Sequence, residues 1–417
     1  MASETPIPIK VQPSAPRALV QAERERSRWI DWITIGNIFV GQGDFDSLRT
    51  WKRQPTAGDA EIIILDAMGR GLLPMSKDVR VKHFQSGAFN ILFELNCPDW
   101  KDKTTILRIS MPYDPWYKTE SEVATMMYAA RSGVPIPCCL FFDSSGKNPF
   151  RLEWMILAKV DKAISLQVSF NRDHQNNAVF NKAKAAGHIL LRDVAKFSRN
   201  LEATKFDKIG SLYYNWDDNL FYVGPIVDTR FLGKYTYRFS IGNRGPFKSC
   251  QDYLQSILQT RHRAGIYDGA QATDANTRMA IQLRACASFA FGAAVLARFK
   301  ATAAKYEKNL DPENGPFHGS WAYVQHDDLH MGNVLIRPTN CGLASLIDWE
   351  QCKILPPFLR RNHGIPKLND DYHKLGFRAV QGTEGLACQI SPPLVSGSPR
   401  EVLWRPSRLL LPLMSPT

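Results

Sequence analysis

The sequence predicts an α+β chain in which a small, strand-rich lobe precedes a larger, mainly helical lobe. Five short segments with strand patterns and one helical segment come first, and two long segments of helical period follow. No internal repeat runs through the chain. We therefore expect an N-terminal arm with short elements over 1–59, a first lobe over 60–156, a second lobe over 157–391 and a Pro-rich tail over 392–417.

The first lobe is predicted from alternating strands and a glycine turn. Val81–Phe84 and Asn90–Leu95 alternate in polarity and flank Gln85–Phe89, a pattern typical of a hairpin. Apolar residues recur at helical spacing over Glu120–Arg131, and Gly133 and Pro135 end that helix. The remaining strands are expected at Thr104–Ser110, Leu140–Asp143 and Trp154–Val160.

The second lobe is predicted to be built on two long helices, Asn181–Leu201 and Ala275–Lys308. The stretch 210–247 between them is rich in Tyr, Phe and Gly, which favours a β-hairpin insertion. Ala322–Arg337 and Ala344–Trp349 are expected to supply two short strands around a polar loop. The apolar run Ala285–Ala297 is shorter than the roughly 20 residues that span a bilayer, so we expect a buried helix there.

Composition limits the classes of function. The 417 residues include 44% apolar and 22% charged side chains, which is ordinary for a globular protein and excludes a wholly disordered chain or a coiled coil. The net charge is +12, but residues 351–417 hold nine Lys and Arg against four acidic residues. Because no basic block is interleaved with aromatic side chains, we expect no nucleic-acid partner, and we expect no membrane span.

Cysteine usage and the N-terminus bear on the compartment. The eight cysteines form no CxxC pair, which favours buried thiols in a reducing compartment over a disulfide framework or a zinc site. Residues 1–20 contain no long apolar stretch, so a cytoplasmic location is expected. Arg17, Arg24, Arg26 and Arg28 suggest a mitochondrial presequence as the alternative, although interspersed glutamates argue against it.

Three oxygen-bearing side chains carry the chemical signal. Asp328 and Asn333 lie five residues apart in a polar loop that leads into a strand, and Asp348 follows at the end of the next strand. Phosphoryl transfer requires one carboxylate to orient the attacking hydroxyl and oxygen ligands to fix Mg²⁺ on the phosphates. We assign Asp328 as the catalytic base, and Asn333 and Asp348 as the metal ligands.

Upstream residues supply a phosphate site in the expected order. The turn at Ser86, Gly87 and Ala88 can bring backbone N–H groups near phosphates. Arg108 stands in the middle of a strand, where a cation can project into a cleft, and Glu122 on the following helix can pair with it. Taken alone, the turn needs no phosphate, and the pair could be an ordinary surface ion pair.

At these residues the chain resembles the aminoglycoside phosphotransferase and choline kinase-related family, particularly fungal members of unassigned substrate. The matching motifs cover about 81–350 and are His326-x-Asp328-Leu329-x3-Asn333, Ile347-Asp348-Trp349-Glu350, Ser86-Gly87-Ala88-Phe89-Asn90, Leu107-Arg108-Ile109, Glu122-Val123-Ala124, Ile209–Tyr213 and Arg244–Phe247.

The resemblance implies a two-lobed, protein-kinase-like fold that phosphorylates a hydroxyl of a small molecule, with ATP as co-substrate and Mg²⁺ as cofactor. It also implies that the segment around Leu157 and Lys159 holds the adenine, and that the turn ending at Asn90 covers the triphosphate. The pattern leaves the acceptor and the oligomeric state open.

Three positions depart from the family's commonest pattern. Arg108 stands where most kinases have lysine, although choline kinase-like relatives also carry arginine. Asp327 places a second carboxylate next to Asp328, which could raise the pKa of Asp328. The region after Asp348 becomes Pro-rich and basic where relatives continue with helices, so a truncated or mis-spliced gene product is a hypothesis to test.

Other interpretations compete with an active small-molecule kinase. A pseudokinase that serves as a nucleotide-binding or scaffold module is the main alternative, whereas the absence of a Phe-Gly pair after Asp348 disfavours a protein kinase. His326 and His330 are spaced like a zinc pair, but the sequence between them does not match a zinc helix. We expect His326 to brace the loop backbone.

Overall fold

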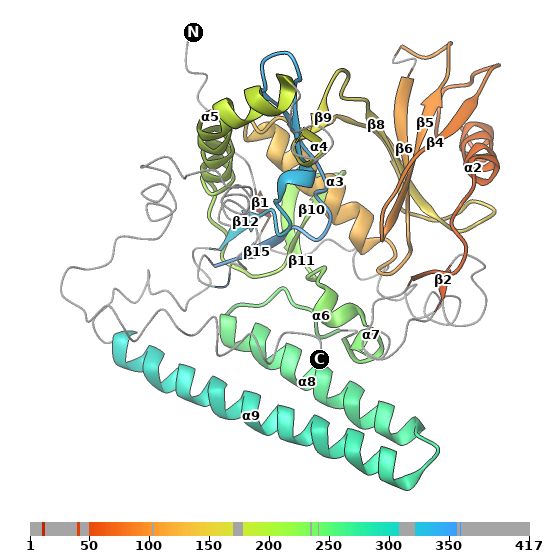
Figure 1. Cartoon of the computed structure of the whole chain (residues 1–417). Helices are drawn as coiled ribbons and strands as arrows, with labels where there is room; N and C mark the ends of the chain where they lie inside the picture. Colours follow the sequence, from red (N-terminus) through yellow and green to blue (C-terminus); the bar gives the residue numbers. More distant parts are fainter. Residues whose placement is uncertain are drawn as a thin grey trace.

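The structure is a computed structural model that describes residues 11–12, 40–41, 50–101, 104–169, 178–233, 236–240, 242–307, 322–356 and 359. A five-stranded antiparallel sheet forms the first lobe, and most of the helices lie in the second (Figure 1). The predicted α+β class, with strands first and helices later, is confirmed. The predicted tail over 392–417 and most of the predicted arm over 1–59 lie outside the described residues.

The sheet of the first lobe has the strand order β4-β5-β6-β8-β7. Its strands are β4 (Arg80–Ser86), β5 (Asn90–Asn96), β6 (Thr104–Ser110), β7 (Cys139–Asp143) and β8 (Glu153–Ala158). All five predicted strands are present, and β6 has the predicted bounds. Arg108 lies opposite Leu92 on one neighbouring strand and opposite Met155 on the other, so it occupies the middle of the sheet.

Two helices cover this sheet. Helix α2 (Ala57–Gly69) begins with a reciprocal capping box between Thr56 and Asp59, and its buried face joins the core beneath the sheet. Helix α3 (Tyr117–Arg131) follows β6 and begins one turn earlier than the apolar spacing predicts. Because α3 passes from the sheet toward the second lobe, its buried side chains enter the cores of both lobes (Figure 1).

The second lobe combines helices with short strand pairs. The helices are α4 (Leu166–Ser169), α5 (Ala178–Leu201), α6 (Thr229–Leu232), α7 (Thr236–Ser240), α8 (Cys250–Gln271), α9 (Ala275–Glu307) and the 3-10 turn η2 (Met331–Asn333). The strands are β9 (Ile164–Ser165), β10 (Ser211–Asn215), β11 (Leu220–Gly224), β12 (Tyr323–Gln325), β13 (Val334–Ile336), β14 (Leu343–Leu346) and β15 (Lys353–Leu355).

The N-terminal arm contributes three short strands. β2 (Val40–Gly41) pairs with β3 (Thr50–Trp51), and β1 (Val11–Gln12) lies parallel to β11. At Val11–Gln12 the arm adds an edge strand to the hairpin of the second lobe, because backbone pairing requires no particular side chains.

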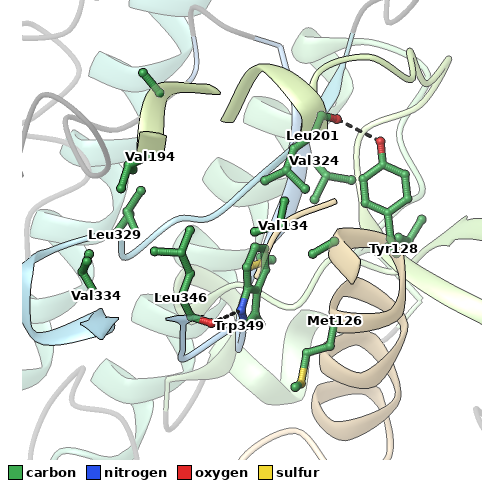
Figure 2. Packing of buried hydrophobic residues seen from close by; sticks show 14 of the residues in the cluster. Met126, Tyr128, Val134, Val194, Leu201, Val324, Leu329, Val334, Leu346 and Trp349 are labelled. Atoms are coloured by element: carbon green, nitrogen blue, oxygen red, sulfur yellow. Dashed lines mark hydrogen bonds between the residues drawn. The ribbon is translucent and has the colours of Figure 1, made fainter. Parts of the chain in front are cut away.

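The core of the second lobe surrounds Trp349, which is buried together with Leu346, Val334 and Leu329 (Figure 2). The indole Nε1–H of Trp349 donates to the carbonyl of Leu346 at 3.0 Å, so its one polar atom is satisfied. Since Trp349 follows Asp348 directly, the packing of this indole anchors the segment on which Asp348 lies.

The β10–β11 hairpin is shared between the two cores. Tyr213 and Tyr222 pack into the core of the first lobe, whereas their neighbours Leu212 and Phe221 pack into the core of the second. This division follows from the alternation of side chains along a strand. The predicted insertion over 210–247 is therefore correct only for its first half, because α6 and α7 follow the hairpin and the hairpin itself joins the lobes.

Helices α8 and α9 form an antiparallel pair along the edge of the second lobe (Figure 1). Their backbones approach closely: a Cβ added to Gly265 would lie 2.7 Å from the Cβ of Ala285, and one added to Gly292 would lie 2.4 Å from Leu258. A larger residue at Gly265 would therefore clash with Ala285, whereas at Gly292 the flexible side chain of Leu258 would have to shift.

The prediction that Ala285–Ala297 is buried is wrong. Within the described residues, Ala275–Arg298 is the one helical stretch long and apolar enough to cross a membrane, and only 6% of its apolar window is buried. Met279, Leu283 and Phe291 are each more than half exposed. Composition identified an apolar helix correctly, but composition does not specify what covers such a helix. Length and composition alone do not establish a membrane span.

Candidate active site

Asp328 lies in the loop between β12 and the turn η2. The amide nitrogen of Asn333 donates to the backbone carbonyl of Asp328 at 2.8 Å, which closes the loop. The imidazole of His330 accepts from Gly332 N at 3.0 Å, and its Nε2 lies 3.5 Å from the Asp328 carboxylate. The side chain of Asp328 is 53% exposed, so this carboxylate is open to solvent.

His326 braces this loop against the following segment, as its position in the sequence predicts. Its Nε2 donates to the carbonyl of Ile347 at 3.0 Å, and its ring packs edge-on against Trp349 at 4.8 Å between centroids. Burial lowers the pKa of His326, which favours the neutral ring that this contact uses. Among the described residues, no group of three or more His, Cys, Asp or Glu is arranged to hold a metal ion.

Asp348 faces Arg108 across the two lobes. Its Oδ1 lies 3.4 Å from a guanidinium nitrogen of Arg108, and 36% of its side chain is exposed. Its backbone has φ of 64°, a conformation rare for a non-glycine residue and common at functional sites. Burial and the nearby charge of Glu350 raise the pKa of Asp348, and Arg108 offsets this only in part. A cation bound at this carboxylate would favour its ionised form.

Arg108 and Glu122 form the predicted ion pair, and the pair is buried rather than superficial. Their side chains are 6% and 1% exposed, and one guanidinium nitrogen donates to the Glu122 carboxylate. Burial alone lowers the pKa of Arg108, but the carboxylates of Glu122, Glu350 and Asp348 outweigh it and hold the guanidinium protonated.

Two charged residues that the sequence reasoning missed complete this cluster. Glu350 accepts from Arg108 at 3.1 Å and from the amide of Asn90 at 2.9 Å. Lys118, on the first turn of α3, lies 2.9 Å from the same carboxylate oxygen. Burial raises the pKa of Glu350, but Lys118 and Arg108 lower it by more than burial raises it. The net pKa is therefore below its ordinary value, and this carboxylate stays ionised. We call Asn90, Arg108, Lys118, Glu122 and Glu350 the charge cluster.

The position of α3 within the charge cluster is fixed from β8. The carboxyl group of Glu153 accepts from the backbone N–H of Trp116 and from the hydroxyl of Thr119, at the N-terminus of α3. This carboxyl group thereby caps a helix that has no side-chain cap of its own. The capped helix carries Lys118 and Glu122 one turn apart on the same face.

Asp327 is compensated by a cation of its own. The ammonium group of Lys353, on β15, donates to the Asp327 carboxylate. Lys353 also lies 3.9 Å from Asp228, which forms a buried pair with Arg230. The second carboxylate beside Asp328 is therefore balanced by Lys353, and the departure from the family pattern is accommodated within the fold.

The remaining predicted residues lie around the sheet. Ser86, Gly87 and Ala88 form the exposed β4–β5 turn, which the N–H of Gly87 closes on the carbonyl of Asn90 at 2.8 Å. The side chain of Asn90 is buried in the charge cluster and does not belong to the exposed turn. Leu157 lies on β8, and the Nζ of Lys159 is 2.5 Å from Glu94.

The donor set fits a magnesium ion. The Nδ2 of Asn333 is used on the carbonyl of Asp328, which leaves Oδ1 as the atom for a ligand. Asp348 contributes a partly exposed carboxylate whose oxygens can reach a ligand. One amide oxygen, one carboxylate and additional oxygens from phosphates or water are the ligands that Mg²⁺ prefers.

Comparison with known proteins confirms the predicted family resemblance. Residues 246–359, from the segment before α8 to the end of the described chain, match the profile of the phosphotransferase enzyme family. That range includes Asp328, Asn333 and Asp348 but not the charge-cluster residues of the first lobe.

Two curated relatives are distant. Subtelomeric hrmA-associated cluster proteins from two strains of Aspergillus fumigatus are each 23% identical to this chain over 348 residues, which covers 70% of this chain and 64% of theirs. The chain thus spans less than two thirds of the length of these relatives.

Solved structures with a similar arrangement include two kinases of small molecules. An aminoglycoside phosphotransferase from Streptomyces rimosus matches with a TM-score of 0.37 and 13% identity, over 81% of this chain and 92% of that one. An ethanolamine kinase from Plasmodium vivax matches with a TM-score of 0.41 and 12% identity, over 90% and 79%. TM-scores of this size add nothing to the fold assignment, which rests on the order of strands and helices described above.

Proposed function

We propose that this protein transfers the γ-phosphoryl group of ATP, in a Mg²⁺-dependent reaction, to a hydroxyl group of a small molecule. One observation supports the proposal most: the loop with Asp328 and Asn333 is hydrogen-bonded to the segment that precedes Asp348. The carbonyl of Asn333 accepts from Ile347 N at 3.0 Å, and His326 donates to the carbonyl of Ile347. A base and two oxygen ligands thus belong to one braced unit.

Each residue has a distinct role in the proposed reaction. Asp328, being exposed, receives the acceptor hydroxyl, orients it toward the phosphoryl group and takes up its proton. Asn333 and Asp348 would hold Mg²⁺, which when bound neutralises charge on the phosphate oxygens. Arg108 contributes a buried, permanently protonated guanidinium toward the phosphates, and Glu122 fixes its direction.

Phosphate contact by the β4–β5 turn and adenine binding near Leu157 and Lys159 are parts of the same proposal. The turn at Ser86–Ala88 is exposed, and Gly87 N is already used within it. Contact with phosphates would therefore come from the other backbone N–H groups of the turn. We also propose the lobe boundaries near residues 60 and 157, the absence of nucleic-acid partners, and a cytoplasmic location.

Thermal unfolding with and without Mg·ATP tests the proposal. A ligand that binds only the folded state adds RT ln(1 + [L]/Kd), or about 2.7 kcal/mol at 100-fold excess over Kd. We expect a Mg²⁺-dependent rise in the wild-type protein that is lost in Asp348→Asn. The matched control is Asp217→Asn, the same chemical change in the exposed β10–β11 turn, which should retain the rise.

Two results would refute the proposal. A folded wild-type protein that shows no rise with Mg·ATP does not bind the co-substrate. An Asp348→Asn variant that shows the full Mg²⁺-dependent rise would remove Asp348 from the metal site. If Mg·ATP binds and no turnover occurs with any hydroxyl acceptor, the nucleotide-binding scaffold is the better description.

A further inference from the structure

Lys118 is fully engaged inside the charge cluster. Its Nζ lies 2.9 Å from Asn90 Oδ1, 3.2 Å from Ser110 Oγ and 2.9 Å from Glu350 Oε2. An ammonium group has three protons, so each proton has one acceptor. The three acceptors come from β5, β6 and the segment after β14, and only 2% of Lys118 is exposed. A lysine buried to this extent occurs only where its charge is paired.

Glu350 depends on this lysine. One of its oxygens, Oε2, receives Lys118, Arg108 and the Asn90 amide together. Around this point two cations face the three carboxyl groups of Glu122, Asp348 and Glu350, so the net charge is −1 when all three are ionised. Without the lysine the same group would carry −2 in that state, and Arg108 alone would have to compensate three carboxylates.

We propose that Lys118 is a positioning residue of the phosphate site, because it neutralises Glu350 and so leaves Arg108 available to phosphates. This inference rests on the proposed function. With Lys118 present, Glu350 is paired with Lys118, and the guanidinium of Arg108 remains paired with Glu122. With Lys118 absent, Glu350 competes with the triphosphate for the same guanidinium nitrogen, which already lies 3.1 Å away.

The backbone that carries Lys118 supports this role. Lys118 lies one turn before Glu122, so the residue that holds Glu350 and the residue that holds Arg108 share one helix face. Glu153 caps that helix from β8, and the residues at Asn90 and Ser110 are paired across neighbouring strands. The first-lobe residues of the cluster are therefore held by β5, β6, β8 and α3 before any ligand arrives, which lowers the cost of organising the site on binding.

The alternative is that Lys118 serves only to fold the protein. In that case its removal lowers stability, and a second substitution at Glu350 adds further damage. In the positioning role, removing the Glu350 charge as well restores the balance of the cluster and frees Arg108. The two roles thus predict opposite effects of the second substitution on nucleotide affinity.

The test is the affinity for Mg·ADP, measured by titration calorimetry without any acceptor. The variants are Lys118→Met, Lys118→Gln, Glu350→Gln and the double variant Lys118→Met/Glu350→Gln. Lys118→Gln retains hydrogen-bonding capacity at Asn90 and Ser110 but lacks charge, so it provides the measurement if the methionine variant does not fold. The matched control is Arg131→Met, which removes a cation from the exposed last turn of the same helix.

We expect both Lys118 variants to bind Mg·ADP on the order of 30-fold more weakly or worse, because breaking a buried charge pair leaves the partner uncompensated. Arg131→Met should bind like wild type. The double variant should recover most of the affinity lost in Lys118→Met. Wild-type affinity in the Lys118 variants, or a double variant that binds more weakly than Lys118→Met, would overturn this inference and leave the proposed function standing. Failure of the wild-type protein to bind Mg·ADP would refute the proposed function, and this inference with it.

Discussion

The two sides of the proposed cleft are built differently. On the nucleotide side, Arg108, Lys118 and Glu122 are buried, the side chain of Glu350 is 10% exposed, and each charge has a partner within about one hydrogen-bond length. On the acceptor side, more than half of Asp328 is exposed. Preorganised charge is costly to build but requires no rearrangement during the reaction. In the proposed reaction, the fold therefore fixes the nucleotide half of the site, while the acceptor half is exposed to solvent.

Removing Arg108 should have the largest effect on stability. Arg108→Met leaves the buried Glu122 without its cation and Glu350 with Lys118 alone, and breaking a buried pair of this kind costs about 3–5 kcal/mol of unfolding free energy. Urea unfolding measures the change. Arg80→Met is the control, because Arg80 pairs with Asp78 at the exposed start of β4 and its loss should leave the midpoint unchanged. Equal midpoints for the two variants would show that the buried side is no more dependent on charge pairing than the surface.

The acid that caps α3 should make the buried side sensitive to pH. Burial raises the pKa of Glu153 from 4.5 to about 8, although Thr119 and the Trp116 amide oppose the shift. The folded protein therefore keeps a proton that the unfolded chain releases, and stability falls as pH rises from 4.5 to about 8.

Substitution of this glutamate isolates its contribution. Glu153→Gln removes the titration while keeping a group that can accept a hydrogen bond. The unfolding free energy of this variant should decline less than that of wild type over the same pH range, measured by urea unfolding at several pH values. Parallel curves for the two proteins would show that Glu153 is ionised in the folded state at neutral pH.

Asp328 should give the smallest change in stability. Asp328→Asn alters an exposed side chain, so the unfolding free energy should change by no more than about 0.5 kcal/mol, and Mg·ADP affinity should stay at the wild-type value. Phosphoryl transfer should nevertheless fall by about 10²–10⁴-fold, the contribution typical of a general base. The decisive comparison is between binding and turnover in one preparation. A variant that loses nucleotide affinity would place Asp328 on the nucleotide side of the cleft.

Local sequence patterns predicted the first lobe well. The strand bounds follow from alternation, and the pairing of Arg108 with Glu122 follows from a mid-strand cation before a helix. Lys118 and Glu350 were missed because they lie 232 positions apart, and their contact exists only once β5, β6 and α3 have assembled. The spacing of Lys118 from Glu122, one helical turn, was the only local signal.

The second lobe shows where local patterns fail. The helix α9 was recognised from its period, but its exposure was not, since burial depends on partners elsewhere in the chain. The segment 210–247 was predicted to be one β-hairpin insertion because its aromatic residues favour strands. The strands in fact end before Asp228, which is the N-cap of the short helix α6. The neighbours Leu212 and Tyr213 pack into different cores, and the type of either residue does not predict which core it enters.

The shared β10–β11 hairpin has a consequence for how the molecule unfolds. Trp116, just before α3, stacks on Tyr213 of β10, and the buried guanidinium of Arg244 binds Asp114 at 2.6 Å, so both links cross between the lobes. A fragment that ended at residue 158 would carry the complete sheet but would expose the apolar surface that Tyr213 and Tyr222 cover. The small lobe therefore cannot be excised as an autonomous unit, and its melting should be cooperative with that of the hairpin, in one transition.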